Sequence, residues 1–349
     1  MTAVKSLYGL FADEIAAALQ PFGFEKYRGS QIADWLYRRG VTRFADMTSL
    51  SRSQRDLLSE QFCIDEPSLL DQQQSLDQKT VKFLLALSDG ASVETVLMRQ
   101  PYGNSVCVST QVGCAMGCEF CASTLNGVSR DLNSGEILAQ VAWVNSYLAA
   151  AGQKVDSVVI MGMGEPLVNY DQVLRFIRLC HQPYCYAMSY RSFTLSTSGI
   201  VPGIVKLAEE NIPLTLAVSL HASNDALRSR LMPVNRRYPL AAVLQAADHY
   251  ASRTGRRVTY EYILIAGVND SAAAALELAQ LLSGRLAHVN LIPVNPVPEK
   301  GLNRPGPDAV ARFEDMLRRN RVSVTLRREM GTEIQAACGQ LRRRAARPL

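Results

Sequence analysis

The sequence lacks the features of a membrane protein or of a secreted one. Its longest apolar runs, Ser157–Gly164 and Leu214–Leu220, have the length of strands and are too short to span a bilayer. The first residues, Met1–Tyr8, lack the apolar core of a signal peptide. We therefore expect a cytoplasmic protein with no membrane partner, whose eight cysteines serve metal binding or catalysis rather than a disulfide framework.

Charged residues make up only 20% of the 349 residues, which is ordinary for a soluble protein long enough for one large domain and a small one. The net charge of +5 is weak evidence for an anionic partner, but its distribution says more. From residue 318 onward only Glu329 and Glu333 are acidic. The arginines there are Arg318, Arg319, Arg321, Arg327, Arg328, Arg342, Arg343, Arg344 and Arg347. Phosphate backbones attract such clusters, although Arg342–Arg347 alone is equally consistent with a solvated tail.

Histidine is scarce, and neither a histidine nor a fourth cysteine follows Cys114, Cys118 and Cys121 at ligand spacing. Gly113 and Gly117 let the backbone bend so that the three sulfurs converge. Structural zinc sites normally close with four ligands, so three thiolates in one loop indicate a 4Fe–4S cluster with one iron left open for a small molecule. The alternatives are unligated cysteines or a zinc site completed from a distance.

Residues 1–62 predict a small helical domain with helices over Ser6–Leu19, Arg28–Arg39 and Arg55–Gln61, the last capped by Ser51 or Ser53. Its basic residues are Lys26, Arg28, Arg38, Arg39 and Arg43. Nucleic-acid binding and plain packing against the rest of the protein are equally consistent with this composition.

Residues 63–100 predict a β extension. The β-rich runs Thr80–Leu87 and Ala91–Met98 are joined by the turn residues 88–90, Ser-Asp-Gly, which indicate a hairpin. Glu94 lies on the second run and could be simply an exposed strand carboxylate.

Residues 101–349 alternate strands with helices, which predicts an α/β fold with a parallel sheet. The expected strands are Ser105–Gln111, Ser157–Met161, Ser192–Ser196, Thr215–Leu220, Arg257–Leu264, Ala287–Ile292 and Val322–Leu326. The expected helices are Ser134–Ala150, Asp171–Cys180, Pro202–Asn211, Asp225–Leu231, Leu240–Arg253, Ser271–Leu282 and Asp308–Asn320. Six such units fall short of the eight that close a full barrel, so we expect a partial (β/α)6 TIM-like barrel with its site beyond the strands' C-terminal ends.

Several polar residues follow these strands. Gly162 and Gly164 leave backbone amides open to a ligand, and Glu165 could accept a hydrogen bond from an ammonium group. Two of these residues could have purely structural roles: Ser196 could cap a helix, and His221 could be a core histidine whose ring nitrogens are hydrogen-bonded within the protein. Asn295, between two prolines, could be turn chemistry.

The remaining cysteines fit buried structural positions if taken alone. Cys107 lies on the first core strand, and Cys338 lies in the stretch Ala-Ala-Cys-Gly-Gln-Leu. Cys63, Cys180 and Cys185 match no motif, so we expect them to be structural.

The spacing of Cys114, Cys118 and Cys121 resembles the signature of the radical S-adenosylmethionine (SAM) superfamily. The stretch Gly-Met-Gly-Glu-Pro at 162–166 and the stretch around Cys338 resemble the RlmN/Cfr family of RNA adenine methyltransferases, most strongly over residues 93–341. Pro166 resembles the RlmN branch, whereas Gln335 departs from the acidic residue more often found there.

This resemblance implies a radical SAM core in which the open iron of the cluster chelates SAM. The matching SAM-binding positions are Gly164, Glu165, Ser196, Ser219, Leu220, His221 and Asn295. It implies that Cys338 accepts a methyl group, that Cys107 later forms a transient disulfide with it, and that Glu94 is the base. It also implies that the N-terminal domain engages RNA.

The implied activity is methylation of carbon 2 of an adenosine in 23S rRNA and in tRNA, with two SAM molecules per turnover and an S-methylcysteine intermediate. The implied electron donor is a protein such as flavodoxin or ferredoxin, and we expect a monomer. The alternatives are a carbon-8 methyltransferase of the Cfr type, against which Pro166 argues, an RNA-binding protein with a structural metal, and a glycyl-radical activase.

Overall fold

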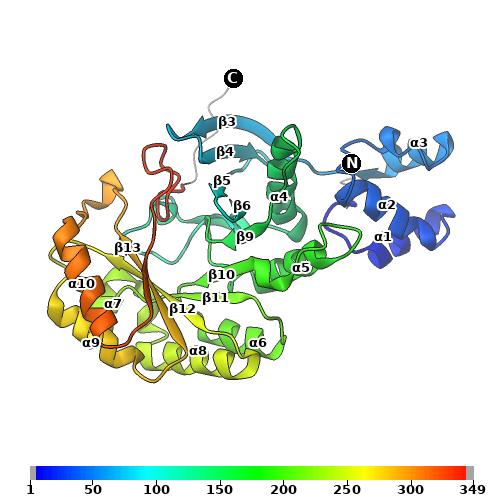
Figure 1. The fold of residues 1–349 in the computed structure, drawn as a ribbon. Coiled ribbons are helices and arrows are strands. Elements are labelled where there is room, and N and C mark those ends of the chain that lie inside the picture. The colour runs from blue at the N-terminus through cyan, green and yellow to red at the C-terminus, as the bar shows by residue number, and fades with distance from the viewer. Residues whose placement is uncertain (1–4, 343–349) are drawn as a thin grey trace.

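The computed structural model describes residues 5–342, which form an α/β fold around one ten-stranded mixed sheet (Figure 1). The strand order is β14-β13-β12-β11-β10-β9-β6-β5-β4-β3. The parallel strands are β6 (Gly103–Cys107), β9 (Ser157–Ile160), β10 (Phe193–Thr197), β11 (Thr215–Ser219), β12 (Val258–Leu264), β13 (Ala287–Pro293) and β14 (Val324–Leu326). Within the described residues β14 and β3 do not pair, so the expected open, partial barrel is confirmed.

Helices follow the strands and cover the outside of the sheet (Figure 1). They are α4 (Ser134–Ala149), α5 (Tyr170–His181), α6 (Val201–Glu209), α7 (Asp225–Leu231), α8 (Leu240–Thr254), α9 (Ala272–Leu282) and α10 (Pro307–Arg319). In α10, Val310, Phe313 and Leu317 recur at helical spacing and are buried, which fixes the face that packs on the sheet. No helix in the described range is long and apolar enough to cross a membrane.

The N-terminal helices are α1 (Ala12–Leu19), α2 (Tyr27–Tyr37) and α3 (Arg52–Gln61), and they stand to one side of the sheet (Figure 1). Ser51 caps α3 in a capping box with Gln54, as predicted. The first half of the first predicted helix is wrong, because residues 5–6 form strand β1, which pairs with β2 (Phe62–Cys63). Gly9 then has a φ of +89° and approaches Gly135 too closely for a side chain.

The β extension is a continuation of the core sheet. The predicted hairpin is confirmed as β4 (Thr80–Ala86) and β5 (Ser92–Gln100), which pair antiparallel. A further strand, β3 (Ser68–Gln74), was not predicted, because it is an edge strand whose polar residues face solvent. On its other side β5 pairs with β6, and Val96 lies opposite Cys107.

Two irregular segments complete the carboxyl-terminal side of the barrel. The predicted strand Ser105–Gln111 is split, because residues after Cys107 leave the sheet and form β7 (Gln111–Gly113), which pairs with β8 (Val128–Asp131). Residues 327–342, here called the C-terminal segment, have no helix or strand and cross in front of the sheet (Figure 1, red). Arg343, Arg344 and Arg347 lie outside the described residues.

Candidate active site

Residues 113–122, here called the cysteine loop, owe their shape to two glycines. Gly113 has a φ of +85°, and a Cβ built on it would lie 1.9 Å from the carbonyl oxygen of Gly127. Gly117 has a φ of +71°. The amide of Cys114 donates to the Gly127 oxygen at 3.2 Å, which ties the start of the loop to the residue that precedes β8. Both glycines therefore do what the sequence predicted, because only glycine adopts these angles without strain.

The three loop cysteines line one cavity of about 140 Å³, here called the thiol cavity. It is also lined by Gly164, Glu165, Ser196, Ser198, Ser219, His221, Glu261, Arg327 and Cys338, among others. Burial raises the pKa of Cys114 to about 12 and raises that of Cys118 well above its ordinary value, and neighbouring thiols add to both effects. Binding of a metal would therefore have to displace protons from these sulfurs.

The three loop thiols line one cavity and number one fewer than the four thiolates that usually hold a 4Fe–4S cluster, so they suit a cluster with one open iron. Within residues 5–342 no group of three or more His, Cys, Asp or Glu side chains is arranged to hold a single metal ion. The ammonium group of Lys300 adds positive charge near the loop, where it donates to the carbonyl oxygen of Cys118 at 3.4 Å.

Glu165 is held rigidly beside the cysteine loop. It is buried, and its carboxylate accepts hydrogen bonds from the amides of Ser198 at 2.6 Å and Leu167 at 3.0 Å. Burial raises the pKa of Glu165, while these amide donors oppose the rise. Gly164, at a φ of +106°, lies so close to Gln111 that a Cβ built on it would be only 2.7 Å from that side chain. Gly164 and Glu165 thus lie together at one edge of the thiol cavity.

The ends of β10 and β11 contribute the next wall. Ser196, Ser219 and His221 line the thiol cavity, whereas Leu220 is buried and lines neither it nor the outer cavity described below. The amide of Ile263 donates to Nδ1 of His221 at 3.0 Å, which leaves the proton of the neutral ring on Nε2. Burial lowers the pKa of His221 to about 3, so the ring stays neutral at physiological pH.

Arg228 joins the strand ends, and sequence reasoning missed it. It is fully buried on α7, and its guanidinium donates to the carbonyl oxygens of Ser198, Ser219 and Leu220 at 2.7, 3.0 and 3.2 Å. It also donates to the side chain of Asn235 at 2.8 Å. Burial lowers the pKa of Arg228 to about 10. No local sequence signal distinguishes it, because Arg230 on the same helix is exposed.

A second cavity of about 360 Å³, here called the outer cavity, adjoins the thiol cavity. Cys338 lines both, together with Met161, Glu261, Ile292 and Arg327, while Cys107 and Asn295 line the outer one. Burial, and secondarily the nearby Cys338, raises the pKa of Cys107 to about 12. All eight cysteines are free thiols in this structure.

Hydrogen bonds fix the C-terminal segment at Cys338 and in the residues just after it. The amide of Asn295 donates to the Cys338 oxygen at 2.9 Å, and the backbone amide of Ala122 donates to the Gly339 oxygen at 2.7 Å. The hydroxyl of Ser123 donates to the Leu341 oxygen at 2.7 Å. The segment is therefore tied directly to the residues that end the cysteine loop.

Glu94 lines neither cavity. It is buried on β5, where its carboxylate faces the ammonium of Lys82 at 3.4 Å and accepts from the backbone amide of Arg342 at 2.8 Å. The expectation of an exposed strand carboxylate is therefore wrong. The contact with Arg342 connects Glu94 to the C-terminal segment, four residues beyond Cys338.

Sequence reasoning also missed three polar residues here: Glu261 and Arg327 line both cavities, and Asn290 lines the outer one. Glu261 on β12 accepts from the side-chain amide of Asn290 on β13 at 3.0 Å. Arg327 lies 3.7 Å from the other carboxylate oxygen of Glu261. The pKa of Arg327 is raised, with Cys338 the largest cause and Glu261 another, so positive charge is concentrated close to the thiol of Cys338.

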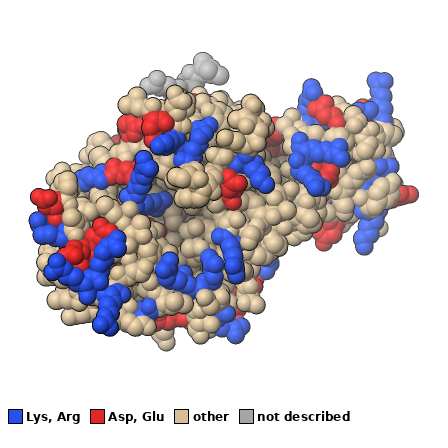
Figure 2. Space-filling view, in the orientation of Figure 1, with Lys and Arg blue, Asp and Glu red and all other residues tan. Residues whose placement is uncertain are grey.

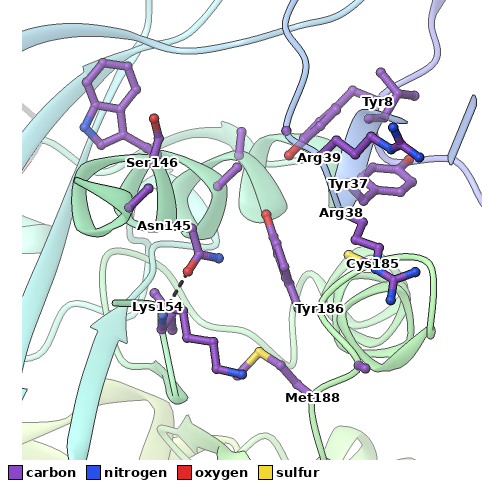
Figure 3. A pocket seen from close by; sticks show the side chains of 18 of the residues that line it. Tyr8, Tyr37, Arg38, Arg39, Asn145, Ser146, Lys154, Cys185, Tyr186 and Met188 are labelled. Atoms are coloured by element: carbon purple, nitrogen blue, oxygen red, sulfur yellow. Dashed lines mark hydrogen bonds between the residues drawn. The ribbon is translucent and has the colours of Figure 1, made fainter. Parts of the chain in front are cut away.

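A larger cavity, about 800 Å³, lies elsewhere, where the end of α2 faces α4 and the loop after α5 (Figure 3). Figure 3 shows Arg38 and Arg39 on one side of it and Asn145 and Lys154 on the other. Both arginines pair with Asp34, so their charge is partly neutralised. None of the predicted catalytic, SAM-binding or cluster-binding residues lines this cavity.

Basic residues outnumber acidic ones in a cavity beside the outer cavity. This smaller cavity, of about 280 Å³, shares Arg328 and Met330 with the outer cavity and is also lined by Lys79 and Arg99. Asp77 and Glu329 line it too, the latter paired with Arg304. Figure 2 shows lysines and arginines around a hollow on this side of the molecule. Such a distribution suits a phosphate backbone.

Comparisons with known proteins point the same way. Residues 108–279 match the model of the radical SAM superfamily, and residues 5–64 match that of a ribosomal RNA large subunit methyltransferase N-terminal domain. The chain is 52% identical to the "Probable dual-specificity RNA methyltransferase RlmN" of Symbiobacterium thermophilum over 98% of this chain and 92% of that protein. It is 50% identical to the protein of the same name from Bacillus cytotoxicus, over 98% of this chain and 94% of the relative. A radical SAM methyltransferase structure from Sphaerobacter thermophilus is 44% identical, with a TM-score of 0.94 over 97% of this chain and 99% of the other.

Proposed function

This chain belongs to the RlmN family of radical SAM RNA methyltransferases, and from that premise we propose that it methylates carbon 2 of an adenosine in 23S rRNA and of one in tRNA. The observation that carries the proposal is the position of Cys338. This thiol borders both the cavity of the three loop cysteines and the cavity that contains Cys107.

Cys114, Cys118 and Cys121 hold a 4Fe–4S cluster, and Gly164, Glu165, Ser196, Ser219, Leu220, His221 and Asn295 bind SAM. When bound, the reduced cluster supplies the electron that cleaves SAM to a carbon radical. Glu165 accepts a hydrogen bond from the SAM amino group, and His221 presents its Nε2 proton to the thiol cavity. Leu220 acts through its backbone, since its side chain is in the core.

Cys338 carries the methyl group. With SAM bound, the Cys338 thiol, close to the Arg327 guanidinium, would lose its proton and accept a methyl group from a first SAM, which would leave as S-adenosylhomocysteine. The radical chemistry of a second SAM would take a hydrogen atom from that methyl group, and the remaining carbon on Cys338 would add to the adenine, join protein to RNA and return one electron to the cluster. Cys107 would then attack the sulfur of Cys338, the bond from that sulfur to the new carbon would break, and the released carbon would take up a proton to become the methyl group, which leaves a transient disulfide that a reductant reopens.

Glu94 accepts the proton that leaves the adenine ring. The contact of its carboxylate with the Arg342 amide supports a base whose position depends on the C-terminal segment. Breaking the hydrogen bond from the Arg342 amide would free one carboxylate oxygen of Glu94 to contact the substrate.

The partners follow from this chemistry. We propose that the helical domain 1–62 and the positive surface near Arg328 bind RNA, that residues 63–100 extend the core sheet, and that 101–349 form the radical SAM core. A low-potential protein such as flavodoxin or ferredoxin supplies the electron. We propose a cytoplasmic enzyme that acts as a monomer.

Mass spectrometry of the peptide containing Cys338 tests this function, on protein purified without oxygen and with its cluster intact. We expect an added CH2 on Cys338, and mapping of the methyl group on treated RNA should find it on carbon 2. A methyl group on carbon 8 would support a Cfr-type activity instead. An unmodified Cys338 in a preparation that contains iron and sulfide would contradict the methyl-carrier scheme.

A further inference from the structure

Glu261 has a buried acceptor that no group among residues 5–342 satisfies. The residue is 4% exposed and lies on β12, between Ser219 of β11 and Asn290 of β13 in the register of the sheet. Its Oε1 accepts from Asn290, but its Oε2 makes no hydrogen bond. Glu261 lines both the thiol cavity and the outer cavity. Buried polar atoms are rarely left unpaired, so such an atom at a cavity wall indicates a ligand that donates to it.

The charge around Glu261 limits what that ligand group can be. Arg327 lies 3.7 Å from Oε2, too far for a hydrogen bond but close enough to compensate the carboxylate charge. A second cation at this point would be repelled by the guanidinium. A neutral N–H group meets no such repulsion and gains a hydrogen bond to a charged acceptor.

We propose that Oε2 of Glu261 accepts a hydrogen bond from the exocyclic amino group of an adenine ring and makes Glu261 a specificity-determining residue. The exocyclic amino group of adenine is a neutral hydrogen-bond donor and can donate to the carboxylate. Hypoxanthine and guanine have a carbonyl oxygen at that ring position, which only accepts and would be repelled by the carboxylate. Asn290 and Arg327 are positioning residues that orient the carboxylate.

The inference rests on the proposed function, which supplies two adenine rings. One belongs to the target nucleotide and the other to SAM, and the wall position of Glu261 faces the cavities of both. The same hydrogen bond is expected in either case, so the experiment must separate the two sources.

The test compares Glu261→Ala, Glu261→Gln and the wild type, each with its cluster loaded. Glu209→Ala, on the exposed surface of α6, is the matched control. The first measurement is kcat/KM for RNA with adenosine at the target position against RNA with purine riboside there, which lacks only the amino group. The second is the affinity of each protein for SAM. The ratio between enzymes cancels the different intrinsic reactivities of the two bases.

If Glu261 binds the target base, the ratio of kcat/KM for adenosine RNA to kcat/KM for purine riboside RNA should be about 10–100-fold higher in the wild type and Glu209→Ala than in Glu261→Ala. The affinity for SAM should then be the same in all three proteins. If Glu261 binds SAM instead, the preference for adenosine RNA should stay and SAM affinity should fall by a similar factor. Glu261→Gln preserves the shape of the side chain, so it should show the same pattern, to a lesser degree, even if the alanine variant folds poorly. Unchanged preference and unchanged SAM affinity in a folded variant would overturn the inference. A wild type that methylates no adenosine in RNA would instead overturn the proposed function.

Discussion

Replacing Arg228 by methionine should destabilise the protein and weaken SAM binding together. Methionine keeps most of the volume of the side chain but removes every donor. The guanidinium donates to three carbonyl oxygens at the ends of β10 and β11 and to Asn235, and it is fully buried. Those acceptors would be left unpaired inside the protein, because neither methionine nor water can replace a forked donor at this position.

The magnitude follows from two opposing effects. Each stranded buried acceptor costs about 1–3 kcal/mol, whereas the desolvation penalty of the charge, several kcal/mol, disappears with the guanidinium. We expect a net loss of about 3–5 kcal/mol in the free energy of unfolding. With an unfolding entropy of about 2.1 cal/mol/K per residue over 349 residues, this corresponds to a fall in Tm of about 4–7 °C.

The assay is calorimetry of the cluster-loaded protein, followed by SAM binding at a temperature at which both proteins are folded. Arg230→Met is the matched control, because Arg230 lies on the same helix but is exposed. SAM affinity should fall in Arg228→Met alone, since Ser198 and Ser219 line the thiol cavity. If the two variants differed by less than about 1 kcal/mol, Arg228 would not hold the strand ends as argued.

Three further results are expected. Cys338→Ala should form no methylated RNA, whereas Cys107→Ala should accumulate a protein–RNA adduct that shifts on a denaturing gel; turnover by both would refute the thiol scheme. Gly113→Ala should lose most of its iron and about 2–4 kcal/mol of stability, because its Cβ would meet a backbone oxygen at 1.9 Å, while Gly255→Ala, in open space, should lose only about 1–2 kcal/mol. Between pH 6.5 and 3 only the unfolded chain binds a proton at His221, so the free energy of unfolding of the wild type should decrease as the pH is lowered through that window. In urea titrations at several pH values, the free energy of unfolding of His221→Gln should decrease less steeply over the same window. Equal dependence on pH in the two proteins would contradict the low pKa.

Much of the core could be predicted because its signal is local. Apolar runs bounded by turn residues gave the strands, and 3.6-residue periodicity gave the helices between them. The cysteine loop and the Gly164–Glu165 turn were predictable for a similar reason, since glycines and ligands close together in the chain must also lie close in space. The first half of the first predicted helix failed because the packing of Gly9 against Gly135, a contact distant in sequence, overrides the local periodicity.

The residues missed by sequence reasoning depend on register and on distant contacts. Glu261 reaches the cavity wall only because β12 pairs with β11 and β13 in one particular alignment. Nothing near Glu94 in the chain shows that Arg342 donates to it. A charged residue on a strand buried on both faces was nevertheless a usable signal, and by that criterion Glu261 could have been singled out.

The depth of the cysteine loop also bears on how the protein withstands oxygen. Oxidants attack thiolates rather than thiols, and at pH 7 a thiol with a pKa of about 12 is ionised in only about one molecule in 100,000. Without iron, Cys114 should therefore oxidise slowly in air. Burial delays ionisation of the thiols when a cluster is assembled. It also protects the sulfurs from oxidation, so that a cluster can be bound again after one is lost.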